Sequence, residues 1–470
     1  MSFVRKAFIL LTVSLGAPLH CYAQEAGFDE AALTTFIESQ MRVSHVPGLA
    51  VGIVQRDRIV YLRGFGTTEG QRITPQSPFL IGSLSKSFTA LGVMQLVEAG
   101  KLNLDTPVHT YLPWFRLKEL AASRTVTVRH LLNQTSGLPT SAGFFSPDAD
   151  SLSKTDLAHP VGRVYEYSNL NYRILGMLIE AVTGQTYAAY IKEHVLEPLQ
   201  MHSTYLTYDD ASNGGLVEGH QYIFVLPVLV STPRYNNGSV AAGYIASSAE
   251  DMCRYLIANL QDGVLDGRRV ISPAGLALMH QPRGEISSRY GMGWVAGEWS
   301  GLESIWHTGM NENFSANMNI LPEKGYGIII LANVNSSTPH NDLMDGIIRR
   351  LHGQQTKSYV PYELLQRLLL LITLLLGLAH LLRQLLKWRR LGYPFLIKMR
   401  TKVIVYLAIG ITLSCVLLTA VTVYADAPLN ALLMYQPDIG YGVICGAVIF
   451  TLAGIIGAFV RSKLSPAAAT

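Results

Sequence analysis

Cysteine is scarce in this chain of 470 residues, which contains four. Cys415 and Cys445 lie in long apolar runs, and Cys21 lies in an N-terminal segment that we expect to be removed. Cys253 would then stand alone in the rest of the chain, so the sequence offers neither a disulfide framework nor a thiolate metal site. The thirteen histidines show no His-x-x-x-His spacing. We therefore predict no metal site and no cofactor.

Charge is also sparse, at 15% of residues with a net value of +4. Residues 361–470 hold ten Lys/Arg against three Asp/Glu, which is +7, so residues 1–360 carry −3 of the total. A mildly acidic domain has no basic footprint for nucleic acid. Nucleic acid is therefore excluded as an expected partner.

Apolar residues, by contrast, are abundant at 49%, and they are concentrated at the two ends of the chain. Residues 1–23 begin with Arg5 and Lys6, continue with an apolar run and end in a small residue, Ala23, which is the pattern of a cleaved secretory signal peptide. We do not expect a lipid on Cys21, because His20 precedes it where lipoproteins carry a small residue. The mature domain, residues 24–360, is then exported.

Three apolar segments follow, at about 364–382, 403–423 and 440–460, each near the length that a bilayer requires. The loop between the first two is strongly basic: Arg383, Lys387, Arg389, Arg390, Lys398, Arg400 and Lys402. The next loop carries only acidic charges, Asp426 and Asp438. Positive loops stay in the cytoplasm. We therefore predict a membrane domain, residues 361–470, with three spans in a bacterial inner membrane and the domain 24–360 on its periplasmic or other extracytoplasmic side.

The stretch 79–90 carries the strongest chemical signal. Ser83 precedes Lys86 by three residues at the start of an apolar helix that Gly100 ends. Residues three apart share a helix face, and burial lowers the pKa of an amine. The sequence thus predicts a base beside a nucleophilic hydroxyl.

The same tetrapeptide, Ser-Leu-Ser-Lys, recurs at Ser151 to Lys154. There the neighbours are polar and include Pro147, Asp148 and Asp150. We predict a solvated loop at this second copy, so only the first copy is a catalytic candidate.

Around these motifs the pattern predicts an α+β domain. A helix at 29–45 and a hairpin at 49–54 and 59–64 precede the serine, and a helical region with no strand follows until about residue 240. A helix at 249–260, four strands at 290–296, 303–306, 316–321 and 326–332, and a helix at 341–351 complete it. We expect an antiparallel sheet flanked by helices with an adjoining helical region, followed by three transmembrane helices.

Two further motifs are weak alone. Tyr167-x-Asn169 lies on a predicted loop before a helix, where an ordinary helix cap is an equal interpretation. A second Tyr-x-Asn, at Tyr235, has no helix after it, so we do not select it. His307-Thr308-Gly309 follows a predicted strand, where an ordinary turn is the alternative.

Together and in this order, the three motifs resemble those of the serine β-lactamase and penicillin-binding-protein superfamily, closest to its class C, D-aminopeptidase and esterase branch, over roughly residues 28–355. The resemblance implies an acylated nucleophile at Ser83, a base at Lys86 and a proton relay at Tyr167. It further implies an oxyanion hole from the backbone N–H groups of Ser83 and Met310. The remaining substrate-binding positions are Asn169, His307, Thr308, Gly309 and Asn311.

His307 departs from the Lys-Thr-Gly of many β-lactamases. A neutral imidazole holds a carboxylate less firmly than an ammonium, which favours small peptides, amides or esters over penicillins. The three spans also resemble the layout of membrane-bound peptidases that remove an N-acyl-D-amino-acid cap. Alternatives are a β-lactamase or DD-carboxypeptidase, an esterase, and a non-catalytic sensor of cell-wall peptides. The sequence gives no oligomeric state.

Overall fold

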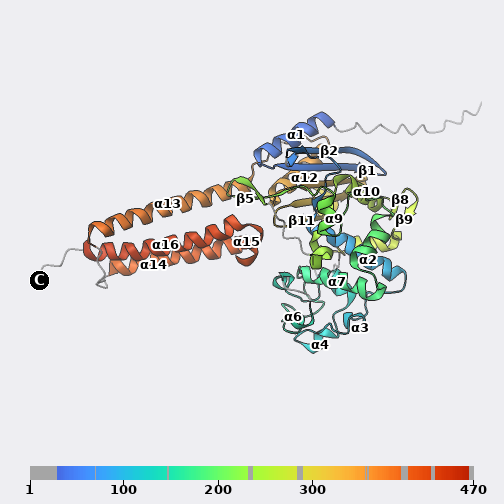
Figure 1. Cartoon of the computed structure of the whole chain (residues 1–470), viewed down its shortest axis with the longest axis horizontal. Helices are drawn as coiled ribbons and strands as arrows, with labels where there is room; N and C mark the ends of the chain where they lie inside the picture. Colours follow the sequence, from blue (N-terminus) through green and yellow to red (C-terminus); the bar gives the residue numbers. More distant parts are fainter. Residues whose placement is uncertain are drawn as a thin grey trace, which may run out of the picture.

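The structure is a computed structural model that describes residues 29–68, 70–144, 148–230, 237–282, 289–354, 356, 359–392, 401–424 and 429–464. The predicted signal peptide and Tyr235 lie outside these residues. The described chain forms an α+β domain and a bundle of long helices that projects from it (Figure 1).

A seven-stranded antiparallel sheet forms the centre of the domain, in the order β10-β11-β12-β13-β1-β2-β3. The strands are β1 (Gly48–Gln55), β2 (Arg58–Thr68), β3 (Gln71–Arg72), β10 (Val295–Trp299), β11 (Leu302–Met310), β12 (Ser315–Leu321) and β13 (Tyr326–Ala332). The middle strands β1, β12 and β13 are buried almost throughout, so helices must cover both faces of the sheet. The predicted hairpin is confirmed as β1 and β2.

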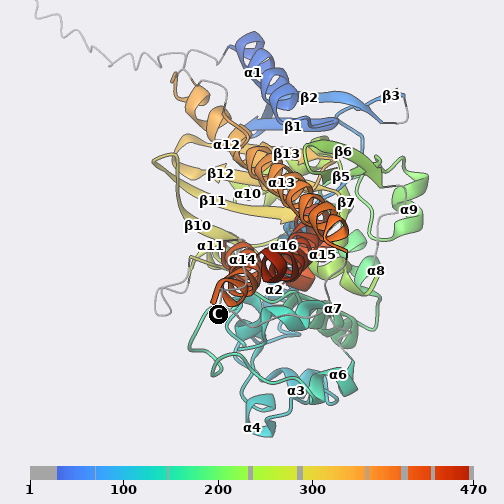
Figure 2. The ribbon, with the colours of Figure 1, turned by 90° about the vertical axis from the view of Figure 1, so that its left-hand side faces the viewer.

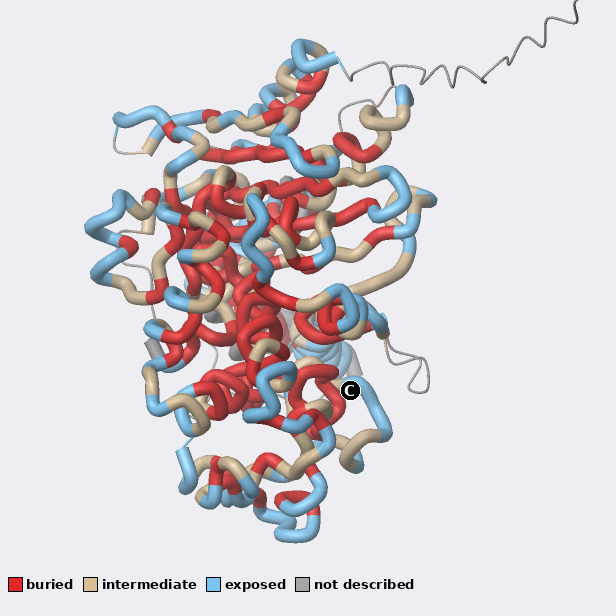
Figure 3. Tube along the Cα trace, turned by 90° about the vertical axis from the view of Figure 1, so that its right-hand side faces the viewer, coloured by how far each residue is buried: buried red, intermediate tan, exposed pale blue. Residues whose placement is uncertain are grey.

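Helices cover both faces of this sheet (Figure 2). On one face α1 (Glu30–Val43) packs against α12 (Ser337–Leu351), and on the other α10 (Ala249–Leu260) packs against β1 and β13. Beyond α10 lies α2 (Ser85–Glu98), whose circumference is almost wholly buried. Figure 3 shows that the buried segments gather in the sheet and in the helices behind it.

The predicted helical region is present, and its main helix, α7 (Asn169–Thr183), packs against α2. The shorter helices are α3 (Val108–Tyr111), α4 (Leu120–Ser123), α5 (Val128–Leu132), α6 (Ala149–Ser153), α8 (Tyr187–Ile191), α9 (Tyr208–Asn213) and α11 (Pro273–His280). Two-stranded pairs join β4 (Phe79–Leu80) with β7 (Ala246–Ser247), and β8 (Val264–Leu265) with β9 (Arg268–Arg269).

A third pair, β5 (Gly219–Ile223) and β6 (Leu226–Val230), corrects the prediction that no strand lies between the helix that follows Ser83 and about residue 240. The hairpin escaped detection because its apolar residues do not alternate between a core and a solvent face. Four of them are exposed instead: Ile223, Leu226, Val228 and Leu229.

Two motif positions also differ from expectation. His307-Thr308-Gly309 lies inside β11 and not in a turn, because all three residues pair with β12. The pairing with β10 ends at Trp306, so β10 does not cover the last part of β11. The second copy of Ser-Leu-Ser-Lys contains a short helix, α6, where a loop was predicted, because the Asp148 side chain caps it by accepting from Ser151 N.

Four helices follow the domain: α13 (Tyr362–Arg390), α14 (Thr401–Tyr424), α15 (Leu429–Tyr435) and α16 (Pro437–Leu464). Within the described residues, two stretches are long and apolar enough to cross a membrane, Tyr362–Arg390 and Pro437–Val460. The apolar part of α14, Ile404–Thr419, is shorter. Gly410 of α14 lies against α16, where a Cβ would come within 2.9 Å of Gly454, so the two helices pack closely.

Candidate active site

Ser83 lies in a 3-10 turn, Gly82–Leu84, directly before α2. The final part of β11 passes against this turn. A Cβ at Gly82 would lie 2.4 Å from Met310 N, and one at Gly309 would lie 2.1 Å from Ile81 O. Gly82 also has a φ of +55°, which side chains disfavour. These two glycines therefore allow the Met310 amide to approach the turn that carries Ser83.

Lys86, on the first turn of α2, is fully buried, and its Nζ lies 2.9 Å from Ser83 Oγ. The same Nζ donates to Asn169 Oδ1 at 2.7 Å and to the Ala242 carbonyl at 2.6 Å. Burial lowers the pKa of Lys86 well below its ordinary value, because the charged form loses its hydration. The predicted pairing of a serine with a buried amine is thus present in the geometry.

Tyr167 precedes α7, and its hydroxyl donates to Ser83 Oγ at 2.8 Å. Burial raises the pKa of Tyr167 well above its ordinary value, and the hydrogen bond to Ser83 opposes this only partly. The phenol is therefore protonated at neutral pH. The centre of its ring also lies 4.9 Å from Lys86 Nζ. The serine hydroxyl, the lysine amine and the phenol are therefore close together.

Asn169 is the first residue of α7 and not part of a loop as predicted. The alternative interpretation was a helix cap at Ser168 or Asn169. Ser168 occupies the N-cap position, but its hydroxyl donates to the Pro139 carbonyl and does not cap the helix. The Asn169 side chain instead points to Lys86 and uses Oδ1 there. The motif therefore belongs to the site.

His307 is buried, and both ring nitrogens have partners inside the protein. Nδ1 lies 2.6 Å from the Thr308 carbonyl, which makes it the donor, and Nε2 lies 3.3 Å from the Tyr290 hydroxyl. Burial, followed by the nearby Lys86, lowers the pKa of His307 to about 3. The imidazole is therefore neutral at physiological pH. Tyr290 stacks edge-on against Tyr167 as well, so it supports two residues of the site.

Two neighbouring positions, Asn311 and Glu312, make contacts that the motifs alone did not reveal. Asn311 Nδ2 donates to the Gly243 carbonyl at 3.0 Å, which fixes the predicted Asn311 beside the turn Val240–Tyr244. Glu312 is buried, and it accepts from the Tyr244 hydroxyl at 2.8 Å. Sequence patterns did not single out Glu312, Tyr244 or Tyr290. For Glu312 alone there was an available signal, namely a carboxylate close after the motif His307-Thr308-Gly309.

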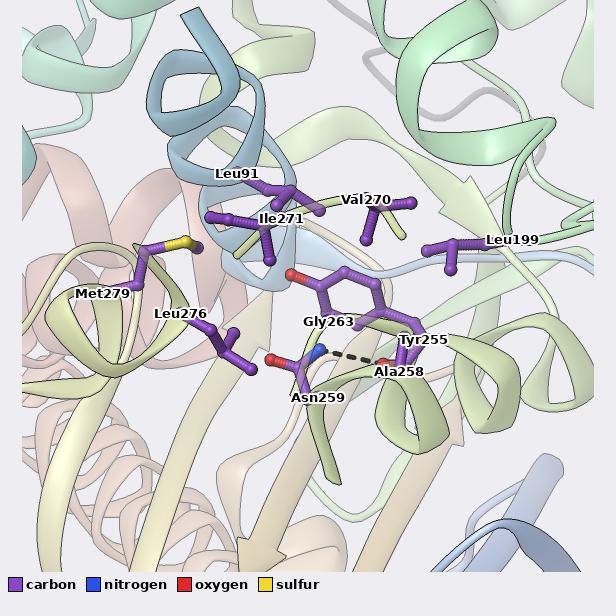
Figure 4. Close-up of a pocket in the computed structure, with 10 residues that line it drawn as sticks. All are labelled: Leu91, Leu199, Tyr255, Ala258, Asn259, Gly263, Val270, Ile271, Leu276 and Met279. Carbon is purple, nitrogen blue, oxygen red and sulfur yellow. Dashed lines mark hydrogen bonds between the residues drawn. The ribbon is translucent and has the colours of Figure 1, made fainter. Parts of the chain in front are cut away.

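Two cavities lie away from these residues. The first, of about 10 Å³ between α2, α10 and α11, has room for one water at most (Figure 4). The second, of about 490 Å³, lies between the hairpin β5–β6 and the helices α13 and α16. In the described part of the chain, no three His, Cys, Asp or Glu residues gather as they would around a metal ion.

Comparisons with known proteins identify the family of this chain. The family model described as Beta-lactamase matches residues 33–352. Penicillin-binding protein 4 of Amycolatopsis lactamdurans is 30% identical over 355 residues, which are 69% of this chain and 91% of that protein. Protein flp of Staphylococcus aureus (strain MW2) is 30% identical over 321 residues, 65% of this chain, and the chain spans 63% of its length.

Among solved structures, the octameric penicillin-binding protein homologue from Pyrococcus abyssi has a TM-score of 0.61 and 27% sequence identity, with 70% of this chain and 78% of that chain covered. The chain therefore belongs to the Beta-lactamase family, in the superfamily of serine β-lactamases and penicillin-binding proteins, whose members are usually serine hydrolases. The predicted resemblance and the α+β fold are confirmed.

Proposed function

We propose that this protein is a membrane-anchored serine hydrolase that cleaves amide or ester bonds through an acyl-enzyme on Ser83. One observation carries the proposal: Lys86 Nζ and Tyr167 Oη lie 2.9 and 2.8 Å from the same Ser83 Oγ. A nucleophile needs a base within hydrogen-bond reach, and the amine is one whose neutral form burial favours.

In the first step, Ser83 Oγ attacks the carbonyl carbon and its proton passes to Lys86. A neutral amine has two N–H groups, and Asn169 Oδ1 and the Ala242 carbonyl accept them, which leaves the nitrogen lone pair for the serine proton. The backbone N–H groups of Ser83 and Met310 would stabilise the oxyanion, at about 3 kcal/mol per donor.

The tetrahedral intermediate then expels its amine or alcohol. Tyr167, which stays protonated, donates to this leaving group and recovers a proton from Lys86. Water attacks the acyl-enzyme by the reverse route and releases the acid. The Nδ2 group of Asn169 remains to bind a substrate carbonyl, since its Oδ1 is held by Lys86.

We further propose that the substrates are small D-amino-acid-containing or N-acylated peptides. The support is His307: a neutral, internally bonded imidazole supplies no fixed positive charge for the carboxylate of a penicillin. Thr308 and Gly309 on the same part of β11 would bind the substrate backbone as an added strand.

To test the substrate class, the full chain in detergent would be offered N-acyl-D-alanine amides, D-Ala-D-Ala peptides, short esters and a chromogenic cephalosporin. We expect the amides or peptides to give the highest kcat/KM. A cephalosporin preference of tenfold or more, about 1.4 kcal/mol, would instead indicate a tethered β-lactamase.

The anchor in this proposal consists of α13, α14 and α16, with the domain outside the cytoplasm. Exposed apolar residues on the hairpin β5–β6 lie at the domain's junction with the helices, where a membrane surface would cover them. A reporter that is active only in the periplasm should work when fused near residue 355 or 430 and fail near residue 392. The opposite pattern would contradict the charge argument.

A further inference from the structure

The helices after residue 360 reach the candidate active site itself. α15 lies at the end of the bundle that is next to the α+β domain (Figure 1). Asn335, which follows β13 and is buried, donates from Nδ2 to the carbonyl of Asn311 and, at 2.7 Å, to that of Tyr435. One side chain therefore ties the last residue of α15 to the residue that follows Met310.

A buried ionic cluster fixes this junction. Arg367 of α13, which is 1% exposed, donates to Asp438 of α16 at 2.5 Å and to Glu363 at 2.9 Å. Asp438 also accepts from Phe224 N at 2.9 Å, and the Ser336 hydroxyl donates to Glu363. Because breaking a buried ion pair leaves a charge without compensation, the cluster resists separation of the helices from the domain.

The electrostatic neighbours of Tyr435 include residues of the candidate site. Burial raises the pKa of Tyr435, and the Glu312 carboxylate raises it further. Tyr435 in turn contributes to the raised pKa values of Tyr167 and Tyr244. Electrostatic effects of this kind weaken with distance, and they agree with the hydrogen bonds of Asn335, which bring the end of α15 to Asn311. Tyr435 is only half-buried, so part of its surface remains accessible.

We propose that Tyr435 forms one wall of the substrate site, so that the membrane part of the chain completes the active site. The inference rests on the proposed function of Ser83. A tyrosine supplies an aromatic face, which suits an uncharged, amide-like part of the substrate. A substrate carboxylate at this wall would be repelled by Glu312.

The test uses the full chain in detergent with an N-acyl-D-alanine amide as substrate and a fluorophosphonate as label. Tyr435→Ala should raise KM about tenfold and change kcat less than threefold, because the lost contact is made equally in the ground state and the transition state. Tyr435→Phe should stay close to wild type, since it keeps the ring. Labelling of Ser83 should be complete in both variants.

Tyr441→Ala is the matched control, because Tyr441 lies on α16 with 60% of its surface exposed and lines the cavity beside the hairpin β5–β6. An unchanged KM in Tyr435→Ala, or an equal change in Tyr441→Ala, would mean that α15 only docks on the domain. If Tyr435→Ala does not fold, Tyr435→Leu keeps the apolar bulk and should raise KM in the same way. Failure to label the wild-type chain would instead reject the function proposed for Ser83.

Discussion

The chain contains the tetrapeptide Ser-Leu-Ser-Lys twice, and the two copies have opposite surroundings. Lys86 is fully buried and makes contacts with Ser83, Asn169 and Ala242. The Lys154 side chain is 70% exposed and pairs with Asp150 at 2.6 Å. The same four residues therefore yield a desolvated amine beside a hydroxyl at the start of α2 and a surface ion pair at the end of α6.

The difference shows that the environment, and not the motif, supplies the chemistry. An amine acts as a base only when its neutral form is populated, and burial provides this at Lys86. The Lys154 side chain instead remains exposed to water beside Asp150, so burial does not favour its neutral form. Parallel substitutions at equivalent positions of the two tetrapeptides test this difference.

The largest difference is expected at the serines. Ser83→Ala should abolish covalent labelling and lower turnover by a factor of about 10³ or more, because the acyl-enzyme cannot form. Ser151→Ala should leave both unchanged. The two variants would be compared by fluorophosphonate labelling and by kcat/KM on the best substrate. Labelling that survives in Ser83→Ala would refute the assignment.

The next largest difference is expected at the lysines. Lys86→Ala should slow acylation by about 10² or more, whereas Lys154→Ala should leave the rate unchanged. Tyr167→Phe should match Lys86→Ala, because both residues move protons at Ser83 Oγ. The double variant should then be little worse than either single one, as measured by single-turnover acylation. Full additivity would show that the two residues act at separate steps.

The sequence predicted this site in part, and the limits have physical causes. Ser83, Lys86 and Tyr167 could be selected because the spacing and local setting of each motif extend over a few residues, and the structure brings the three side chains together. Asn169 was assigned to a loop, since the exact start of a helix depends on which partner its side chain finds. Here that partner is Lys86, which is 83 residues away in sequence.

Long-range contacts account for the remaining errors. His307 was placed at the end of a predicted strand, with a turn as the alternative, because its pairing with β12 cannot be derived from the local sequence. Tyr290 and Tyr435 carry no local motif, and only the folded chain brings them to the site. The hairpin β5–β6 was missed for a local reason, because its apolar residues, several of them exposed, do not alternate between a buried and an exposed face.

The smallest expected difference is in stability, and it depends on pH. Burial lowers the pKa of Lys86 in the folded chain, so between that pKa and 10.5 the unfolded chain binds more protons. The free energy of unfolding of the wild type should therefore rise with pH across this window, by at most about 1.4 kcal/mol per pH unit.

Lys86→Met removes the titrating group while keeping a long flexible side chain. Its thermal unfolding temperature, measured on the full chain in detergent from pH 7 to pH 10, should rise less steeply with pH than that of the wild type. Lys154→Met should follow the wild-type curve, because Lys154 is solvated in both states. Parallel curves for all three proteins would mean that Lys86 is charged in the folded chain, and the base would then have to be sought elsewhere.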